Sequence, residues 1–171
     1  MTPTERPGHL CRELLAFYGD EGCNASGYTL EQVLGWDDED FEMQHDFIQW
    51  LFPIDEPSLF SPDAPVLDAA TIVQFRADPL LRHRLRRSFD RWLAFCGVVR
   101  TGDGLAFDNP NPDVWDRPNH NWLRITRVLR SLNLLGLSDE ARVFFALLTT
   151  IRARIDPTTW GYWERAARIE T

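Results

Sequence analysis

The chain has 171 residues, a formal net charge of −8 and a sequence pI near 4.9. A chain of this length buries about 70% of the surface that its unfolded form exposes, so it needs no disulfide or metal to fold. Its acidic balance argues against a general affinity for nucleic-acid phosphates. The three cysteines lack CxxC spacing, which argues against a disulfide framework. Without a signal-peptide pattern, a membrane-length apolar run or a cofactor motif, we expect a soluble, intracellular, cytoplasmic protein.

The first third of the chain is predicted to be helical. Residues 1–28 are predicted as a helix over Glu5–Tyr18 followed by a loop, because apolar side chains there recur at helical spacing. Thr29 is expected to cap a short second helix. The acidic run Asp37–Asp40 favours the start of a third helix, which we expect to continue to Pro53.

The middle of the chain is predicted to hold its longest helix. Residues 54–65 are rich in proline and predict an irregular segment, after which Asp68 is expected to cap a short helix. Asp78-Pro79 is a strong start signal, because an N-cap precedes proline at the first helical position. The helix that follows is expected to end with Cys96 at Gly97.

The last part of the chain is predicted to contain a long loop and three helices. Residues 100–118 are rich in Gly, Asn and Pro and predict the loop. Asn119 is expected to cap a helix that ends at Gly136, Ser138 to cap the next, and Asp156 a last helix that extends to Ile169. Since no useful alternation of period two occurs, we expect no strand. The sequence therefore predicts an all-α fold over residues 1–171, a single compact domain of about seven to nine helices.

Two polar strips are candidates for function. In the first, Glu42, His45 and Gln49 share one face of the predicted helix, and Trp50 lies beside it. The imidazole, amide and indole could bind a ligand, or His45 and Gln49 could hydrogen-bond the backbone and lock the turn at Pro53. Glu42-x-x-His45 matches half of a di-iron motif, but no second copy exists, so we expect no metal.

The second strip begins the helix predicted after Asn119. A helix start attracts anions, and His120, Asn121, Arg124 and Arg127 follow at once. This arrangement could hold a carboxylate or phosphate of a ligand. Alternatively, the polar residues cap the helix, and the arginines pair with acidic residues elsewhere in the chain.

The sequence signals for catalysis and for nucleic-acid binding are weak. The arginines over Arg82–Arg91 suggest phosphate binding, but the net charge favours a solvated face and no nucleic-acid partner. Cys96 lies on an apolar stripe, which is unfavourable for a reactive thiolate, and no GxSxG, GxGxxG or P-loop motif occurs. We therefore expect no enzyme.

Three segments resemble the conserved N-terminal region of the opioid growth factor receptor family, over about residues 36–148. They are Ile48-Gln49-Trp50-Leu51-Phe52-Pro53, Phe95-Cys96-Gly97-Val98, and His120-Asn121-Trp122-Leu123-Arg124-Ile125-Thr126-Arg127. The resemblance implies a receptor-like protein unrelated to seven-helix receptors. Its animal relatives are intracellular, nuclear or perinuclear, and bind the enkephalin pentapeptide.

From the strips and the resemblance together we expect a non-enzymatic binding module for a small peptide or peptide-like ligand. The alternatives are a hydrolase or transferase that uses His45 and His120, and a protein-interaction scaffold. In the leading hypothesis Arg124 and Arg127 bind the ligand carboxylate, His45 and Gln49 its backbone, and Trp50 or Trp122 an aromatic side chain.

Overall fold

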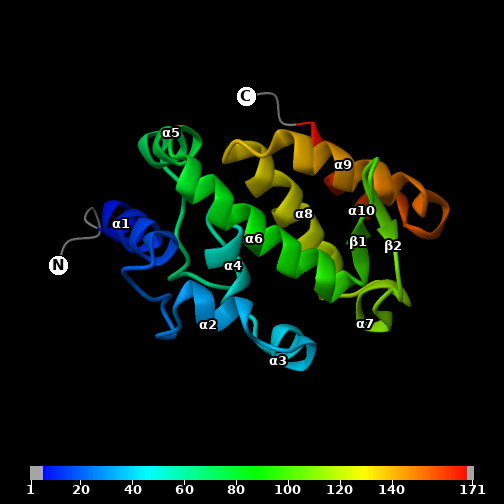
Figure 1. The fold of residues 1–171 in the computed structure, drawn as a ribbon, viewed down its shortest axis with the longest axis horizontal. Helices are drawn as coiled ribbons and strands as arrows, with labels where there is room; N and C mark the ends of the chain where they lie inside the picture. Colours follow the sequence, from blue (N-terminus) through cyan, green and yellow to red (C-terminus); the bar gives the residue numbers. More distant parts are fainter. Residues whose placement is uncertain (1–5, 169–171) are drawn as a thin grey trace. The chain divides into compact units, whose positions relative to one another are not determined.

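The computed structural model describes residues 6–168, with side chains described from Leu10 onward. Within this range the chain forms ten α-helices, one short 3-10 helix and one hairpin of two strands (Figure 1). The predicted all-α fold class is confirmed. The helices outnumber those expected because the helix predicted before Pro53 is two helices, and a further short helix lies at Pro112–Trp115. Among the described residues, none of the helices combines the length and apolar character that a membrane span requires.

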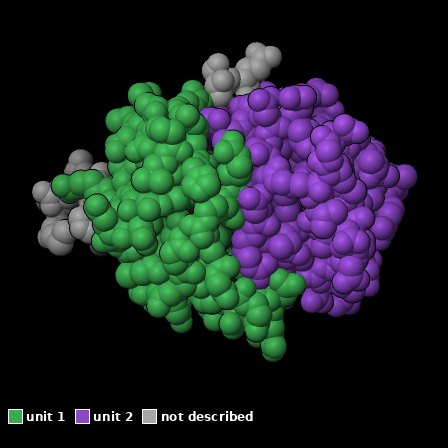
Figure 2. Space-filling model, in the orientation of Figure 1, with its two compact units in different colours: residues 1–88 green, residues 89–171 purple. Residues whose placement is uncertain are grey.

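The chain divides into two compact units, residues 1–88 and residues 89–171 (Figure 2). The boundary falls inside the longest helix, which the sequence predicts correctly from Pro79 to Cys96. The first unit contains α1 (Arg6–Gly19), α2 (Leu30–Leu34), α3 (Asp38–Met43), α4 (Ile48–Leu51), α5 (Ala69–Ala77) and the beginning of α6 (Pro79–Cys96).

Side-chain caps start several helices of the first unit. The Thr29 hydroxyl accepts a hydrogen bond from Gln32 N, and the Gln32 side chain accepts one from Thr29 N, which completes a capping box. Asp37 caps α3 and Asp68 caps α5 in the same way, through a carboxylate oxygen that accepts a backbone N–H. The predicted caps at Thr29 and Asp68 are therefore confirmed.

Aromatic rings make up much of the core of the first unit. Phe17 and Tyr18 of α1 are fully buried, as is Phe75 of α5. Tyr18 meets Phe75 edge-on with ring centroids 5.0 Å apart, and Phe17 meets Trp50 of α4 at 5.8 Å. Edge-to-face pairs contribute about 0.5–1.5 kcal/mol each beyond the area they bury. These contacts hold α1, α4 and α5 together.

The second unit is organised around α8. This helix packs most extensively against α10 and α9, and also contacts α7. Its buried residues Ile125, Val128, Leu129 and Leu132 recur at helical spacing, as the sequence predicts. The elements are the end of α6, β1 (Val98–Arg100), β2 (Leu105–Phe107), α7 (Pro112–Trp115), α8 (His120–Leu134), α9 (Ser138–Thr149), the 3-10 helix η1 (Arg152–Arg154) and α10 (Pro157–Ala167).

The strands form an antiparallel hairpin that the sequence did not predict. Val98 pairs with Phe107 and Arg100 with Leu105, and β2 packs on α9 (Figure 1). The expectation of no strand is wrong, and the loop predicted over residues 100–118 also contains α7. Two strands of three residues are too short to show an alternating pattern.

Three further expectations concern the ends of helices. Asp156 caps α10 by accepting a hydrogen bond from Thr159 N at 2.9 Å, as predicted. The prediction that Ser138 caps a helix is wrong, because α9 begins at Ser138 itself and has no side-chain capping hydrogen bond. The outer ends of the first and last predicted helices, Glu5 and Ile169, lie outside the described residues.

Candidate functional site

The first polar strip does not lie on one helix. After α3, Gln44 takes an extended conformation with φ −81° and ψ 141°, and α4 begins only at Ile48. His45 lies in this connection and is exposed. The predicted helix face shared by Glu42, His45 and Gln49 is therefore wrong, because the backbone leaves the helical conformation between the first of these residues and the last.

Gln49 and Trp50 are buried in the first unit. With its amide nitrogen turned toward the connection, Gln49 donates hydrogen bonds to the carbonyl oxygens of His45 and Asp46, each at 3.1 Å. Gln49 is only 7% exposed and Trp50 only 2%, with the indole packed against Phe17. These contacts support the interpretation in which the strip locks a turn. Of the strip's three candidate ligand-binding residues, His45 alone is exposed to solvent.

The second strip starts α8, and its asparagines are engaged by the fold. Asn119 Oδ1 accepts a hydrogen bond from Asn121 N at 2.8 Å, so the predicted cap is confirmed. Asn119 Nδ2 donates to the carbonyl oxygens of Asp113 and Arg117 at 2.9 and 2.7 Å. Asn121 is fully buried, and its Oδ1 accepts a hydrogen bond from Arg124 Nη1 at 3.1 Å. Together the two asparagines tie the α7 connection to the first turn of α8.

Asn119→Ala is expected to lower the free energy of unfolding by about 1–2 kcal/mol, because it removes an N-cap and three donated hydrogen bonds. Urea denaturation followed by far-UV circular dichroism measures the loss. Asn119→Ser is the matched control: it keeps a capping oxygen but not the amide donor, so about half of the loss is expected. A wild-type midpoint for Asn119→Ala would contradict this role.

An exposed stripe remains along α8. His120 and Leu123 are exposed, Leu123 to 60%, and Arg127 and Arg130 are half-buried. Their spacings of three and four residues place them on one helix face. Arg124 is four residues from His120 and three from Arg127, but it is only 6% exposed. We call the residues His120, Leu123, Arg127 and Arg130 the α8 stripe.

Trp122 belongs to the core and not to the α8 stripe. It is 5% exposed, and its indole Nε1 donates to the Val114 carbonyl at 2.9 Å. Trp163 of α10 in turn donates from Nε1 to the Trp122 carbonyl at 2.9 Å, and the two rings meet edge-on with centroids 5.8 Å apart. Trp122, like Trp50, therefore packs in the core. The burial of both rings argues against the expectation that either one contacts a ligand.

The other residues considered for chemistry are His45, His120 and Cys96. His45 belongs to the first unit and His120 to the second, and both are exposed. Cys96 is fully buried at the end of α6. Within residues 6–168, no group of three or more His, Cys, Asp or Glu side chains is arranged to hold a metal ion.

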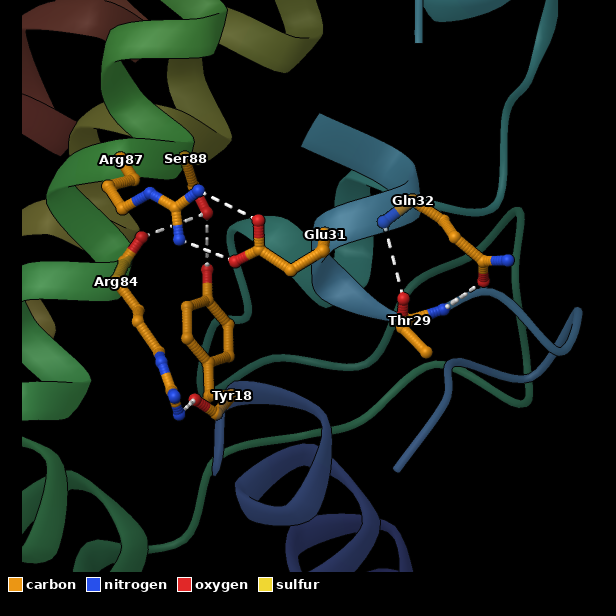
Figure 3. A network of polar contacts seen from close by, with 7 residues as sticks. All are labelled: Tyr18, Thr29, Glu31, Gln32, Arg84, Arg87 and Ser88. Atoms are coloured by element: carbon orange, nitrogen blue, oxygen red, sulfur yellow. Dashed lines mark hydrogen bonds and ion pairs between the residues drawn. The ribbon is translucent and has the colours of Figure 1, made fainter. Parts of the chain in front are cut away.

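A polar network in the first unit was missed from the sequence (Figure 3). The Tyr18 hydroxyl is fully buried, donates to the Leu51 carbonyl and lies 3.1 Å from Ser88 Oγ. Arg84 Nη1 donates to the Tyr18 carbonyl at 2.6 Å, which satisfies an acceptor at the end of α1. Burial, opposed by the hydrogen bond with Ser88, raises the pKa of Tyr18 well above its ordinary value.

An ion pair extends this network from α6 to α2 (Figure 3). Arg87 donates to both carboxylate oxygens of Glu31, at 2.5 and 2.8 Å. Hydrogen bonding from Arg87 lowers the pKa of Glu31. The side chains are 41% and 50% exposed, so such a pair contributes only about 0–1 kcal/mol. The arginines of α6 are thus not simply a solvated face, because Arg84 and Arg87 each bind a specific partner.

Comparison with known families places both polar strips in one conserved segment. The sequence matches the family described as "Opioid growth factor receptor (OGFr) conserved region" over residues 12–154. The chain belongs to the opioid growth factor receptor family. The match extends beyond the resemblance over residues 36–148 and includes most of the described helices.

Animal members of the family are similar over most of this chain. Opioid growth factor receptor of Mus musculus is 34% identical over 147 residues, 80% of this chain and 23% of its own length. The Homo sapiens receptor is 33% identical over 138 residues, 72% of this chain and 20% of its own length. Opioid growth factor receptor-like protein 1 of Xenopus tropicalis is 30% identical over 149 residues, 78% of this chain and 27% of its own length. The chain thus spans about a quarter of these relatives. No solved structure matches it.

Proposed function

We propose that the chain is a non-enzymatic binding module and that the α8 stripe binds a small peptide or peptide-like ligand. One observation carries the proposal. In the family segment His120–Arg127, Asn121 and Trp122 are buried in the fold, whereas His120, Leu123 and Arg127 retain exposed surface. Two basic side chains around one exposed leucine can offer a peptide both a charge partner and an apolar contact.

The chemistry of the stripe suits the carboxyl end of a peptide. Arg127 provides a planar guanidinium, which binds a carboxylate through two parallel hydrogen bonds. His120 is in the first turn of α8, where the helix dipole favours an anion. Arg124 is 6% exposed and donates to Asn121, so we assign the carboxylate to Arg127 and His120 and give Arg124 a supporting role.

His45 is a separate candidate within the first unit. Its exposure supports a role in contacting a ligand, whereas Gln49 donates to backbone and Trp50 packs in the core. A His45→Ala variant, measured beside the α8 variants, tests this contribution independently.

A thermal-shift titration with Tyr-Gly-Gly-Phe-Met is the direct test. Peptide at 100 times its Kd is expected to add about 2.7 kcal/mol, which raises Tm by roughly 5–11 °C for a domain of this size. A scrambled peptide of the same composition controls for sequence. The same peptide with a C-terminal amide controls for the carboxylate and is expected to give a clearly smaller shift.

Substitutions within the α8 stripe then test whether the peptide binds there. Arg127→Gln is expected to remove the preference for the free carboxylate, whereas Arg142→Gln is expected to leave it unchanged. Arg142 is a suitable control because it is on α9, its side chain is 74% exposed and it pairs with Asp139. Equal shifts from the acid and the amide, or an unchanged preference in Arg127→Gln, would exclude the proposed carboxylate contact.

A further inference from the structure

The most exposed apolar side chains among the described residues lie next to each other in the first unit. Leu59 is 93% exposed and Phe60 is 84% exposed, whereas the next large hydrophobic residue, Met43, is 68% exposed. Two adjacent residues of this kind present a large apolar side-chain area to water. Such surface on a folded domain marks a site of contact with another molecule.

The loop that carries these residues is closed at its base. Ile54 and Val66 form a parallel bridge, and Leu67 N donates to the Ile54 carbonyl at 2.9 Å. Cys11 Sγ also donates to the Val66 carbonyl at 3.2 Å, which ties the base to α1. The eleven residues between the bridged pair, 55–65, therefore begin and end at a fixed place in the first unit.

The tip of the loop contains its own hydrogen bonds. Ser58 Oγ accepts hydrogen bonds from Phe60 N at 3.3 Å and from Ser61 N at 3.2 Å, and Ala64 N donates to the Ser61 carbonyl at 3.0 Å. Three prolines, Pro57, Pro62 and Pro65, fix further backbone angles. Since this backbone is already arranged, less conformational freedom is lost when Leu59 and Phe60 are buried by a partner.

The charge around the loop selects the kind of partner. Asp55, Glu56 and Asp63 are exposed within it. From Glu13 to Phe75 the sequence has fourteen acidic residues and neither Arg nor Lys. Anionic membranes and nucleic acids are repelled by the exposed carboxylates of the loop. A protein surface with an apolar centre and a rim of Arg or Lys is complementary to it.

We propose that residues 55–65 form a docking loop that inserts Leu59 and Phe60 into an apolar site on a basic protein partner. This interaction surface consists of residues of the first unit, whereas the α8 stripe consists of residues of the second. The acidic residues steer the partner to the loop, and the two apolar side chains supply the buried contact. The proposal stands independently of peptide binding by the stripe.

The test uses a displayed library of random dodecapeptides as the probe. Peptides that bind the full chain are selected, and those that also bind the Leu59→Ser/Phe60→Ser double variant are removed by counter-selection. Enriched peptides are expected to contain apolar residues flanked by Arg or Lys. Synthetic copies are expected to bind the double variant at least tenfold more weakly than the wild type. Leu123→Ser, which removes an exposed leucine from the α8 stripe, is expected to change their Kd less than twofold.

The charge contribution is tested with the same synthetic peptides. Asp55→Asn/Glu56→Gln/Asp63→Asn is expected to weaken binding several-fold at low salt and to reduce its salt dependence. Far-UV circular dichroism of every variant checks that the fold is intact. Enrichment of peptides without basic residues, no enrichment over the counter-selection, or an unchanged Kd in the double variant would overturn the proposal. Loop-dependent binding to phosphatidylserine vesicles, or loop-dependent dimerisation of the chain, would overturn it too.

Discussion

Gly97→Ala is expected to lower the free energy of unfolding by about 2–5 kcal/mol. Gly97 ends α6 with a φ of +69°, a left-handed conformation that costs other residues about 1–2 kcal/mol. A Cβ added there would lie 2.2 Å from the Asn109 carbonyl oxygen and 2.8 Å from Pro110 Cα. Relief of such an overlap by backbone shifts costs about 1–3 kcal/mol more. Thermal unfolding followed by circular dichroism should show a fall in Tm of roughly 4–20 °C.

The backbone near Gly97 cannot move away without further loss. Asn111 Nδ2 donates to the Phe95 carbonyl at 2.8 Å, and Trp115 Nε1 donates to the Cys96 carbonyl at 2.7 Å. These bonds satisfy the last carbonyls of α6 and hold the 109–115 segment against the helix end. A shift that accommodates a methyl group at Gly97 would lengthen them, at about 1 kcal/mol for each bond lost.

Gly102→Ala is the matched control for this prediction. It lies in the same hairpin region, and an added Cβ would meet nothing within 4 Å. Its Tm is therefore expected to stay within about 2 °C of the wild type, since it lacks both the strain and the overlap. Equal effects of the two substitutions, or a Gly97→Ala variant with wild-type Tm, would show that the close approach to Asn109 is not rigid.

Local signals in the sequence were sufficient for most helix boundaries. Thr29, Asp68, Asn119 and Asp156 each accept the backbone hydrogen bond that a cap requires. These signals act over three or four residues, so they do not depend on distant contacts. The long apolar stripes of α6 and α8 were equally recognisable, because a helix period repeated over four turns is seldom ambiguous.

The break between α3 and α4 was not predictable from spacing. Phe41, Ile48 and Leu51 keep a helical period and are all buried, yet the backbone at Gln44 is extended. No Gly or Pro marks the interruption. Instead Gln49, which is buried, binds the carbonyl groups of the connection. A side chain that replaces helix hydrogen bonds in this way is recognised only once its position in the core is known.

The same limit applied to the candidate site. Polar residues in a shared motif can serve a ligand or the fold, and the sequence alone left both interpretations open. Asn121 and Trp122 are buried and bind backbone carbonyls of the α7 segment, whereas His120 and Leu123, on either side of them, are exposed. Which neighbours point inward depends on how α7 and α10 pack against α8. The sequence therefore located the motif but not the residues within it that are available for binding.

Tyr18→Phe is expected to lower the free energy of unfolding by about 1–3 kcal/mol at pH 7. The substitution keeps the aromatic ring that packs against Phe75 but removes the hydroxyl. The Leu51 carbonyl and Ser88 Oγ, which the hydroxyl contacts inside the first unit, then lose that partner in a buried environment. Urea denaturation at pH 7 measures this loss. Tyr28→Phe and Tyr162→Phe, at tyrosines that are 38% and 50% exposed, are expected to stay within about 0.5 kcal/mol of the wild type.

The pH dependence separates the buried hydroxyl from simple packing. Burial raises the pKa of Tyr18 above that of an unfolded tyrosine, which is about 10. The folded state therefore binds this proton more tightly. The contribution of Tyr18 to stability is complete below pH 10 and falls as the pH rises beyond it. The expected loss is about 1.4 kcal/mol by pH 11.

Tyr18→Phe should lack this alkaline loss, so its free energy of unfolding should approach that of the wild type between pH 9 and pH 11. The chain suits the measurement because it contains no lysine, and arginine stays charged throughout this range. All other ionisable groups are common to both proteins, so their contributions cancel in the difference between the two stabilities. Parallel curves for the wild type and Tyr18→Phe would mean that the phenol ionises as readily in the folded chain as in the unfolded one. The buried link from Tyr18 to Leu51 and Ser88 would then be ruled out.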